Sequence, residues 1–446
     1  MTAPRGADIL AISLATTVAM WTLFYVAAMP PGLIPLWPVA FAIAVGLLAA
    51  GLVAGRYAGR GWAGGAAVGV AVGAVNLLVL LSLLGGDRLG EQMISTAKWI
   101  SGFLAAAVVL GAIGAAIGKT TARARPPANW TARFAWMTAL TTLFMLVAGG
   151  LVTSLEAGLA VEGWLRPEGH LLIFFPLSLM QRDMNTFAEH AHRLLGLLVG
   201  VSTIMLMVLV WMGDRRWWLR WLTVLAVLAV AGQGVLGGTR VTEESVALAV
   251  VHGIFAQMIF ALLVVIASAA SFAWYSDREP TVHASAATDR TLSIVLVVVI
   301  LGQITAGTVF RHLQPLPDVP RTALMGLLNG HAFIGSLLVI AMVLLCGVRA
   351  WGIYRDQPII KRLGTILIHT TMLQVVLGLG SFIVVPKGPR DGIEIPPLEV
   401  GLTTAHQATG AILLAAAAAL FAWQRRLTAP LPAGTRDEGR GTSQES

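Results

Sequence analysis

The chain has 446 residues, of which 57% are hydrophobic and only 12% are charged, and its mean hydropathy is +0.80. A water-soluble domain of this size needs far more charge to cover its surface, so a soluble globular protein is excluded. The formal net charge of +8 accompanies no nucleic-acid-binding motif, so we expect no nucleic-acid partner and attribute the excess to the loops of a membrane protein.

Unbroken apolar stretches of about 20 residues recur along the chain, and each is long enough to cross a bilayer as a helix. They lack the alternation of apolar and polar residues that a membrane barrel requires. We therefore predict an all-α polytopic membrane protein with about twelve transmembrane helices in contact with lipid, followed by a disordered cytoplasmic tail over residues 427–446. In chain order, the spans are expected near residues 9–28, 31–54, 62–85, 99–118, 134–154, 189–211, 217–237, 247–273, 291–310, 327–348, 363–385 and 403–424.

The charged loops predict the orientation of these spans. Most of the 30 Lys and Arg residues fall at the two termini and in the loops after even-numbered spans, whereas the loops after odd-numbered spans hold nine. Basic loops stay in the cytoplasm, so we expect a multi-pass protein of the bacterial inner membrane with both termini cytoplasmic. The single cysteine, Cys346, excludes an intramolecular disulfide.

The longest linker on the predicted outer side is residues 155–188. It contains Trp164 and a short apolar run from Leu171 to Pro176. Two interpretations are equally open: a lid that lies in the membrane interface, or a packed loop.

Four histidines occupy matching positions in the predicted spans. Each lies within about six residues of the outer end of an even-numbered span, within one or two helical turns of the same level. A lone buried histidine is more often hydrogen-bonded to a neighbour than bound to a metal. Four at one depth on alternate helices instead favour imidazoles that face one another and hold haem iron from both sides. These residues are His192, His252, His331 and His406, whereas His369 lies at another depth and is expected to be a core residue.

The arrangement is duplicated. Residues 134–273 and 291–424 each hold four predicted spans, with histidines on the second and the fourth. The third span of each half carries a Gln-x-x-Leu-Gly element, beginning at Gln233 and at Gln374, 141 residues apart. His192 and His331 are 139 residues apart. The similar offsets predict two pseudo-symmetric four-helix haem-binding bundles.

One position distinguishes the two halves. Glu189 precedes His192 by three residues and shares its helical face, whereas Leu328 stands at the matching place before His331. The carboxylate either gives the first site a different task or is an interfacial residue at a helix start, where acids are favoured. His190 points away from His192 and is a weaker ligand candidate.

Several segments together resemble the haem A synthase family. Glu189-His190-Ala191-His192-Arg193 is similar to that family's Glu-x-x-His-Arg motif. Thr404-Ala405-His406-Gln407-Ala408 is similar to its fourth-histidine motif, and residues 149–154, 232–238 and 251–253 also fit. The resemblance covers about residues 134–425, and only the combination of motifs is specific.

This resemblance implies a membrane oxidoreductase that oxidises a ring methyl of haem O to the formyl group of haem A, for the assembly of terminal cytochrome oxidase. His192 and His252 would flank the substrate haem. His331 and His406 would hold a haem b that passes electrons. Glu189 would be the essential carboxylate, and Arg193 and Arg311 would pair with haem propionates. Haem O synthase and an electron donor would be partners, and oligomers are compatible with this assignment.

These interpretations divide the chain into four regions. Residues 1–130 form an N-terminal four-helix membrane region of unknown role, which the family does not need. Residues 131–275 form the substrate-haem half, residues 288–426 the haem b half, and residues 427–446 the tail. Many family members have paired cysteines in outer loops, which this chain lacks.

Two other functions remain open from the sequence. A non-enzymatic di-haem b-type electron carrier would use the same four histidines but would not need Glu189. A twelve-helix transporter is supported by the span count alone, and it should place its polar residues near the middle of the membrane.

Overall fold

The computed structural model describes Pro4 and residues 6–30, 36–84, 89–122, 128–275, 279–386 and 395–431. Among these residues, eleven helices are long and apolar enough to cross a membrane. The remaining one of the twelve predicted spans corresponds to α3 (Trp62–Leu84). The prediction of an all-α polytopic membrane protein is therefore confirmed. The chain separates into two compact units, Met1–His252 (unit 1) and Gly253–Ser446 (unit 2).

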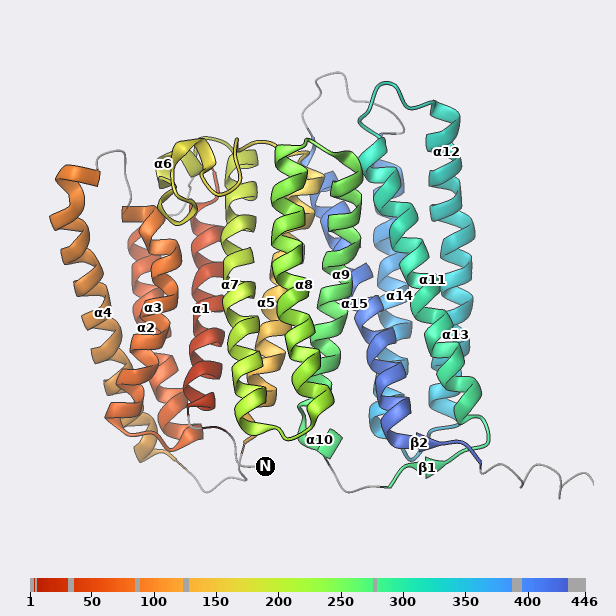
Figure 1. Ribbon diagram of the computed structural model, residues 1–446, viewed down its shortest axis with the longest axis horizontal. Helices are drawn as coiled ribbons and strands as arrows, with labels where there is room; N and C mark the ends of the chain where they lie inside the picture. The colour runs from red at the N-terminus through yellow and green to blue at the C-terminus, as the bar shows by residue number, and fades with distance from the viewer. Residues whose placement is uncertain are drawn as a thin grey trace, which may run out of the picture. The chain divides into compact units, whose positions relative to one another are not determined.

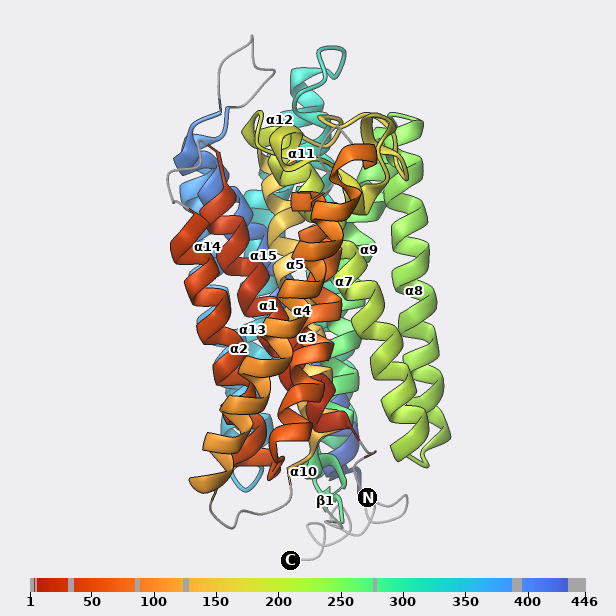
Figure 2. The same cartoon turned by 90° about the vertical axis from the view of Figure 1, so that its left-hand side faces the viewer.

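Unit 1 begins with four helices, α1 (Ala7–Ala28), α2 (Leu36–Ala58), α3 and α4 (Leu89–Thr120). The helices α2, α3 and α4 run side by side with their backbones in contact (Figures 1 and 2). A Cβ atom on Gly51 or Gly65 would lie 2.2 Å from the carbonyl oxygen of Gly111. Glycine is needed at this crossing because any side chain would force the helices apart.

The start of α1 is fixed by a buried acid. Asp8 is 6% exposed and forms an ion pair of 2.6 Å with Arg60, in the segment between α2 and α3. The hydrogen bond to Asp8 raises the pKa of Arg60. Because α1 also packs against α5, this ion pair ties the N-terminal helices to the rest of unit 1.

The second part of unit 1 contains α5 (Trp130–Ser154), α7 (Met184–Gly213), α8 (Trp217–Thr242) and the start of α9 (Val246–Ala269). Side-chain caps define where two of these helices begin: Asn129 accepts a hydrogen bond from Ala132 N (2.9 Å), and Asp183 accepts one from Thr186 N (2.8 Å). The linker from α5 to α7 contains η1 (Pro167–Gly169), η2 (Leu172–Phe174) and α6 (Leu177–Met180).

Unit 2 is built on four spans, namely α11 (Ala286–Leu313), the continuous run α12 (Arg321–Asn329), η3 (Gly330–Gly335) and α13 (Ser336–Gly352), then α14 (Pro358–Val384) and α15 (Pro397–Leu427). The segment η3 is a wide π-type turn inside the second span. The helix α10 (Phe272–Tyr275) precedes these spans, and β1 (Thr281–Val282) pairs in parallel with β2 (Thr428–Ala429). Residues 428 and 429 of the predicted tail therefore form a strand, whereas residues 432–446 lie outside the described part.

A buried polar network closes one end of unit 2. Asp289, which is 2% exposed, accepts hydrogen bonds from Arg349 Nε (2.5 Å) and from the hydroxyl of Tyr354 (2.7 Å). Desolvation of the phenol and its bond to Asp289 raise the pKa of Tyr354. These contacts join α11 to the end of α13.

The helices begin before the predicted spans, so the four histidines lie further from the starts of their helices than the sequence predicted. They follow the first residue of their helix or continuous helical run by six to ten residues, counted from Met184, Val246, Arg321 and Pro397. Hydropathy missed these first turns because they carry polar and charged residues, such as Asn185 and Glu399. We call this end of each unit, where α7 and α12 begin, its histidine end.

Candidate functional site

Two histidines meet near the histidine end of unit 1. His192 comes from α7 and His252 from α9, and their ring centres lie 6.4 Å apart with an angle of 75° between the ring planes. The two side chains thus face each other across the interior of the helix bundle.

Unit 2 repeats this arrangement with other helices. His331 comes from η3 and His406 from α15, with ring centres 6.1 Å apart and an interplanar angle of 86°. The structure therefore brings the four predicted ligands together as two pairs, one in each unit.

The separation of the rings fits one metal ion between each pair. A metal–imidazole bond is about 2.0–2.1 Å long and the ring centre lies about 1.1 Å behind the nitrogen, so opposed imidazoles on one ion have centres about 6.3 Å apart. No third His, Cys, Asp or Glu joins either pair among the described residues. Each pair would thus supply two imidazole ligands, the number that haem iron takes from a protein that holds it from both sides.

Each imidazole rests against a glycine of a neighbouring helix. A Cβ atom at that glycine would lie between 2.6 and 3.0 Å from the imidazole carbon Cε1, too close for the ring to keep its place. The rings therefore occupy cradles that only glycine leaves open. The glycine–histidine pairs are Gly149–His192, Gly237–His252, Gly307–His331 and Gly378–His406.

A glutamine stands four residues before three of these four glycines. Gln233 donates to the carbonyl of His252 (2.9 Å), Gln303 donates to the carbonyl of His331 (2.7 Å), and the amide of Gln374 donates to Nε2 of His406 (3.3 Å). The fourth position, on α5, is Met145. One turn of helix thus supplies both the cradle and a hydrogen bond that holds the histidine residue.

The tautomer of His331 is fixed by the backbone. Its Nδ1 donates to the carbonyl oxygen of Gln303 (3.0 Å), which leaves the lone pair of Nε2 available for a metal. Metal-binding histidines commonly donate their other ring nitrogen to such an acceptor, which orients the ring.

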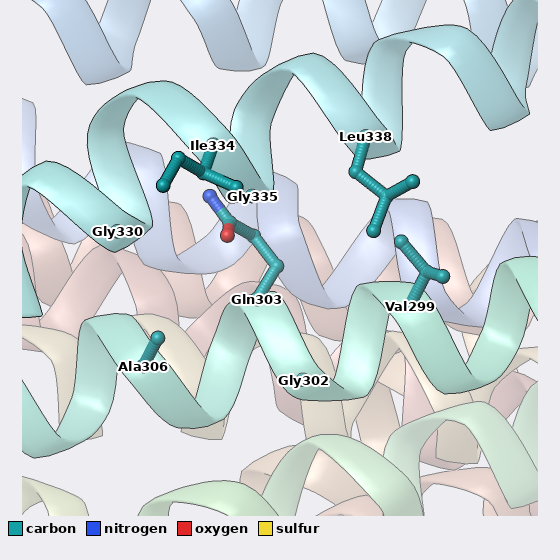
Figure 3. Close-up of a pocket in the computed structure, with 8 residues that line it drawn as sticks. All are labelled: Val299, Gly302, Gln303, Ala306, Gly330, Ile334, Gly335 and Leu338. Carbon is teal, nitrogen blue, oxygen red and sulfur yellow. The ribbon is translucent and has the colours of Figure 1, made fainter.

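Residues at the end of the π-type turn η3 also support His331. Figure 3 shows Gln303 extending from α11 toward Gly335, where a Cβ atom would lie 1.9 Å from Oε1 of the glutamine. The hydroxyl of Ser336 also donates to the His331 carbonyl (3.0 Å). The glutamine lies in a mostly apolar cavity of about 290 Å³, lined by Val299, Gly302, Gln303, Ala306, Gly330, Ile334, Gly335 and Leu338.

Unit 1 places a buried carboxylate beside its histidine pair. Glu189 has a side chain only 4% exposed and forms an ion pair of 2.5 Å with Arg193, one turn further along α7. Its other oxygen accepts a hydrogen bond from Val161 N (2.9 Å). Glu189 is therefore a buried residue whose two oxygens are both held by partners, and the interpretation as a hydrated interfacial residue is wrong.

Arginines hold the linker over the histidine end of unit 1. Arg193 donates to the carbonyls of Val161 (2.9 Å) and Gly163 (2.7 Å), and Arg240 donates to that of Gly158 (2.8 Å). Trp164 packs directly on Gly238, where a Cβ atom would lie 2.0 Å from the indole ring. Of the two interpretations of the linker, the packed loop describes this segment. The sequence did not single out Arg240, because the predicted span ended before it.

The remaining candidates lie apart from the two pairs. His190 is fully buried and stacks on Phe175 with a centroid separation of 4.4 Å. Arg311 donates to the side-chain oxygen of Gln314 (2.8 Å). His369 is exposed and bonded to the carbonyl of Thr365 (2.8 Å), so the prediction of a core residue is wrong. An apolar helix in a membrane can point a side chain outward, which hydropathy does not reveal.

A family model for cytochrome oxidase assembly proteins, COX15-CtaA, matches residues 132–418. The chain belongs to this family. The match contains both histidine pairs, the four cradle glycines and the buried carboxylate. A COX15-CtaA protein serves the assembly of cytochrome oxidase, and in this COX15-CtaA protein the helices α1 to α4 lie outside the matched region. No curated protein and no solved structure matches the chain.

Proposed function

We propose that this protein is a haem A synthase, an oxidoreductase that oxidises a ring methyl of haem O to the formyl group of haem A. The observation that carries the proposal is an asymmetry: two histidine pairs have the spacing for haem iron, and one turn before His192 unit 1 has the buried carboxylate Glu189 where unit 2 has Leu328. Two equal electron-carrying sites would not need this difference.

In this proposal His192 and His252 hold the substrate haem O, and His331 and His406 hold a haem b. As a monooxygenase, the enzyme would use dioxygen as the oxidant in successive hydroxylations of the methyl, and the haem b would pass on the donor electrons that the reduction of dioxygen also requires. The residues of the chain orient the two haems: the cradle glycines set the rings, and the glutamines fix the backbone of His252 and His331.

Glu189 is proposed as the catalytic carboxylate. Its ion pair with Arg193 holds it in a site from which water is largely excluded. A carboxylate near the reacting methyl stabilises positive charge that develops there and can accept the proton that leaves. Such a group is effective because its position is fixed before the reaction begins.

The loop charges support an inner-membrane location in a bacterium, with both termini in the cytoplasm and both histidine ends toward the outer side. We propose that haem O arrives from haem O synthase through the membrane. The helices α1 to α4 are proposed to stabilise unit 1 or to dock a partner.

The test compares Glu189→Gln with the parent protein. Glutamine keeps an acceptor for Val161 N but removes the charge, so conversion of haem O to haem A should fall by about 100-fold or more while the six-coordinate haem spectrum remains. The matched control is Glu162→Gln. Glu162 is an exposed carboxylate in the linker between α5 and α7, so this variant should convert haem O to haem A as the parent does.

The alternatives give other results. Conversion at the parental rate by Glu189→Gln would remove the carboxylate from the mechanism. Parent protein that binds two haems but produces no haem A would be a di-haem electron carrier, and colourless protein from haem-replete cells would favour the transporter.

A further inference from the structure

The histidine end of unit 1 holds two arginines and one carboxylate. Arg193 and Glu189 form the ion pair already described, with side chains 11% and 4% exposed. Arg240, on α8, is half-buried and interacts electrostatically with both of these residues and with His192. Its guanidinium donates a hydrogen bond to a neutral acceptor, the carbonyl of Gly158.

With two arginines and one carboxylate, this cluster has one positive charge that no acidic residue of the cluster neutralises. Within the described residues, the one ion pair found in the cluster joins Arg193 and Glu189, and Arg240 is in no ion pair. The acidic residues of the nearby loops, Glu162 and Glu243, are exposed. Because charges withdrawn from water are normally paired, the excess charge favours the binding of an anionic group.

The three corresponding positions of unit 2 carry no charge. With the offsets of the two halves, Glu189, Arg193 and Arg240 correspond to Leu328, Ala332 and Ser381. Leu328 lies in a hydrophobic cluster with Phe310 and Leu324, and Ala332 packs against it. The charges are therefore not required for holding a histidine pair in place.

Arg240 is well placed for a ligand of the unit 1 pair. It follows the cradle glycine Gly237 by three residues, so both lie on the same face of α8. A carboxylate is a stronger acceptor than a backbone carbonyl and can bind a guanidinium with two parallel hydrogen bonds. A carboxylate ligand would thus displace Gly158 as the partner of Arg240.

We infer that Arg240, with Arg193, forms a carboxylate-binding site that holds a propionate of the substrate haem in unit 1. The inference rests on the proposed function. In haem O, the methyl that is oxidised and one propionate are neighbours on the same pyrrole ring. A propionate held by Arg240 therefore brings that methyl toward Glu189, and the site selects the orientation in which the correct methyl reacts.

The test measures binding to the vacant substrate site of full-length protein, purified from cells without haem O so that unit 2 is loaded. The two probes are iron protoporphyrin IX and its dimethyl ester, which lacks the carboxylate charges. The parent should bind the free acid about tenfold more tightly than the ester, as judged from the Soret absorbance. Arg240→Gln keeps a donor for Gly158 but loses the charge, so it should bind the two probes with similar affinity.

The matched control is Arg182→Gln. Arg182 holds the same linker through the carbonyl of Ala160 (3.2 Å) and through an ion pair with Glu168 (2.6 Å). This variant should still prefer the free acid. Loss of the preference in Arg182→Gln, or its survival in Arg240→Gln, would overturn the inference, as would equal binding of both probes by the parent. A parent that binds neither probe would instead overturn the proposed function.

Discussion

Unit 1 and unit 2 share the apparatus that holds a histidine pair and differ in what surrounds it. Both set each imidazole against a glycine, and both use a glutamine to hold a histidine residue. At the matching position one turn before the first histidine, unit 1 buries Glu189 in an ion pair with Arg193, whereas unit 2 buries Leu328 among apolar side chains. The histidines, glycines and glutamines that both units share can hold a metal. The residues that differ between the units determine the chemistry at that metal.

The largest effect on haem binding is expected from replacing a cradle glycine with alanine. In Gly307→Ala the new Cβ atom would lie 2.6 Å from Cε1 of His331, so the ring must move and its bond to iron is lost. We expect affinity for haem in unit 2 to fall by about 100-fold, the upper range for groups that support a metal ligand. Haem content per chain, measured by pyridine haemochrome, should fall from two to one.

Gly302→Ala on the same helix is the control, because nothing lies within 4 Å of its Cβ position. Gly237→Ala should remove only the haem of unit 1. Retention of both haems by Gly307→Ala and Gly237→Ala would mean that the cradles do not position the ligands.

Placing a carboxylate in the apolar end of unit 2 should have the next largest effect. Leu328 is 6% exposed in a cluster with Phe310 and Leu324. Leu328→Glu buries an acid without a partner and should destabilise unit 2 by about 2–4 kcal/mol. Thermal unfolding followed by haem absorbance would measure this loss.

A second substitution sharpens the same comparison. Adding Ala332→Arg to Leu328→Glu copies the pair Glu189–Arg193 and should recover part of the stability. If Leu328→Glu unfolds at the parental temperature, the histidine end of unit 2 is not the sealed apolar region that its contacts indicate.

These regions also show how far the sequence leads. The four histidines could be found because span ends and helical periodicity place them at one depth. The cradle glycines were visible only as small residues, because the neighbour that a glycine meets depends on the rotation of each helix. Arg240 was missed for a different reason: the predicted span ended at residue 237, while α8 continues to Thr242, so a half-buried cation was assigned to a loop.

The spacing of Glu189 and Arg193 contained more information than was taken from it. Residues four apart on a helix are neighbours, and an acid before a base at this spacing predicts an ion pair. The backbone partners of these two side chains, Val161 and Gly163, could not be predicted, because they lie in a linker without periodicity.

A smaller effect is expected from exchanging the supporting residues of the two units. Gln303→Met copies Met145 of α5 and removes a donor to the His331 carbonyl. Because Ser336 still donates to that carbonyl, the cost should be about 1 kcal/mol, seen as about fivefold faster loss of haem to a scavenging apoprotein.

The double variant Gln303→Met with Ser336→Ala should lose haem faster than the two single effects combined, because the carbonyl then has neither side-chain donor. An additive result would show that the two donors act independently and that the turn η3 does not depend on them.

The smallest effect concerns how the two histidine-bearing helices begin. Asp183 caps α7 by accepting hydrogen bonds from the backbone and hydroxyl of Thr186, whereas α12 begins after Pro320 without a side-chain cap bond. Burial disfavours the ionised Asp183, but the bonds from Thr186 and the charge of Arg182 outweigh it, so its pKa lies below the usual range. Such a carboxyl stabilises the fold above the unfolded pKa of about 3.9, and this contribution is lost as the pH falls through the lower folded value.

Hydrogen exchange should therefore show the first turn of α7 opening as the pH falls from about 6 to about 2, while α12 changes little. Asp183→Ala should cost about 1 kcal/mol near neutral pH, and Asp183→Asn should retain most of the cap but lose its pH dependence. Equal acid sensitivity of the two helix starts would show that the charge of Asp183 is not what distinguishes them.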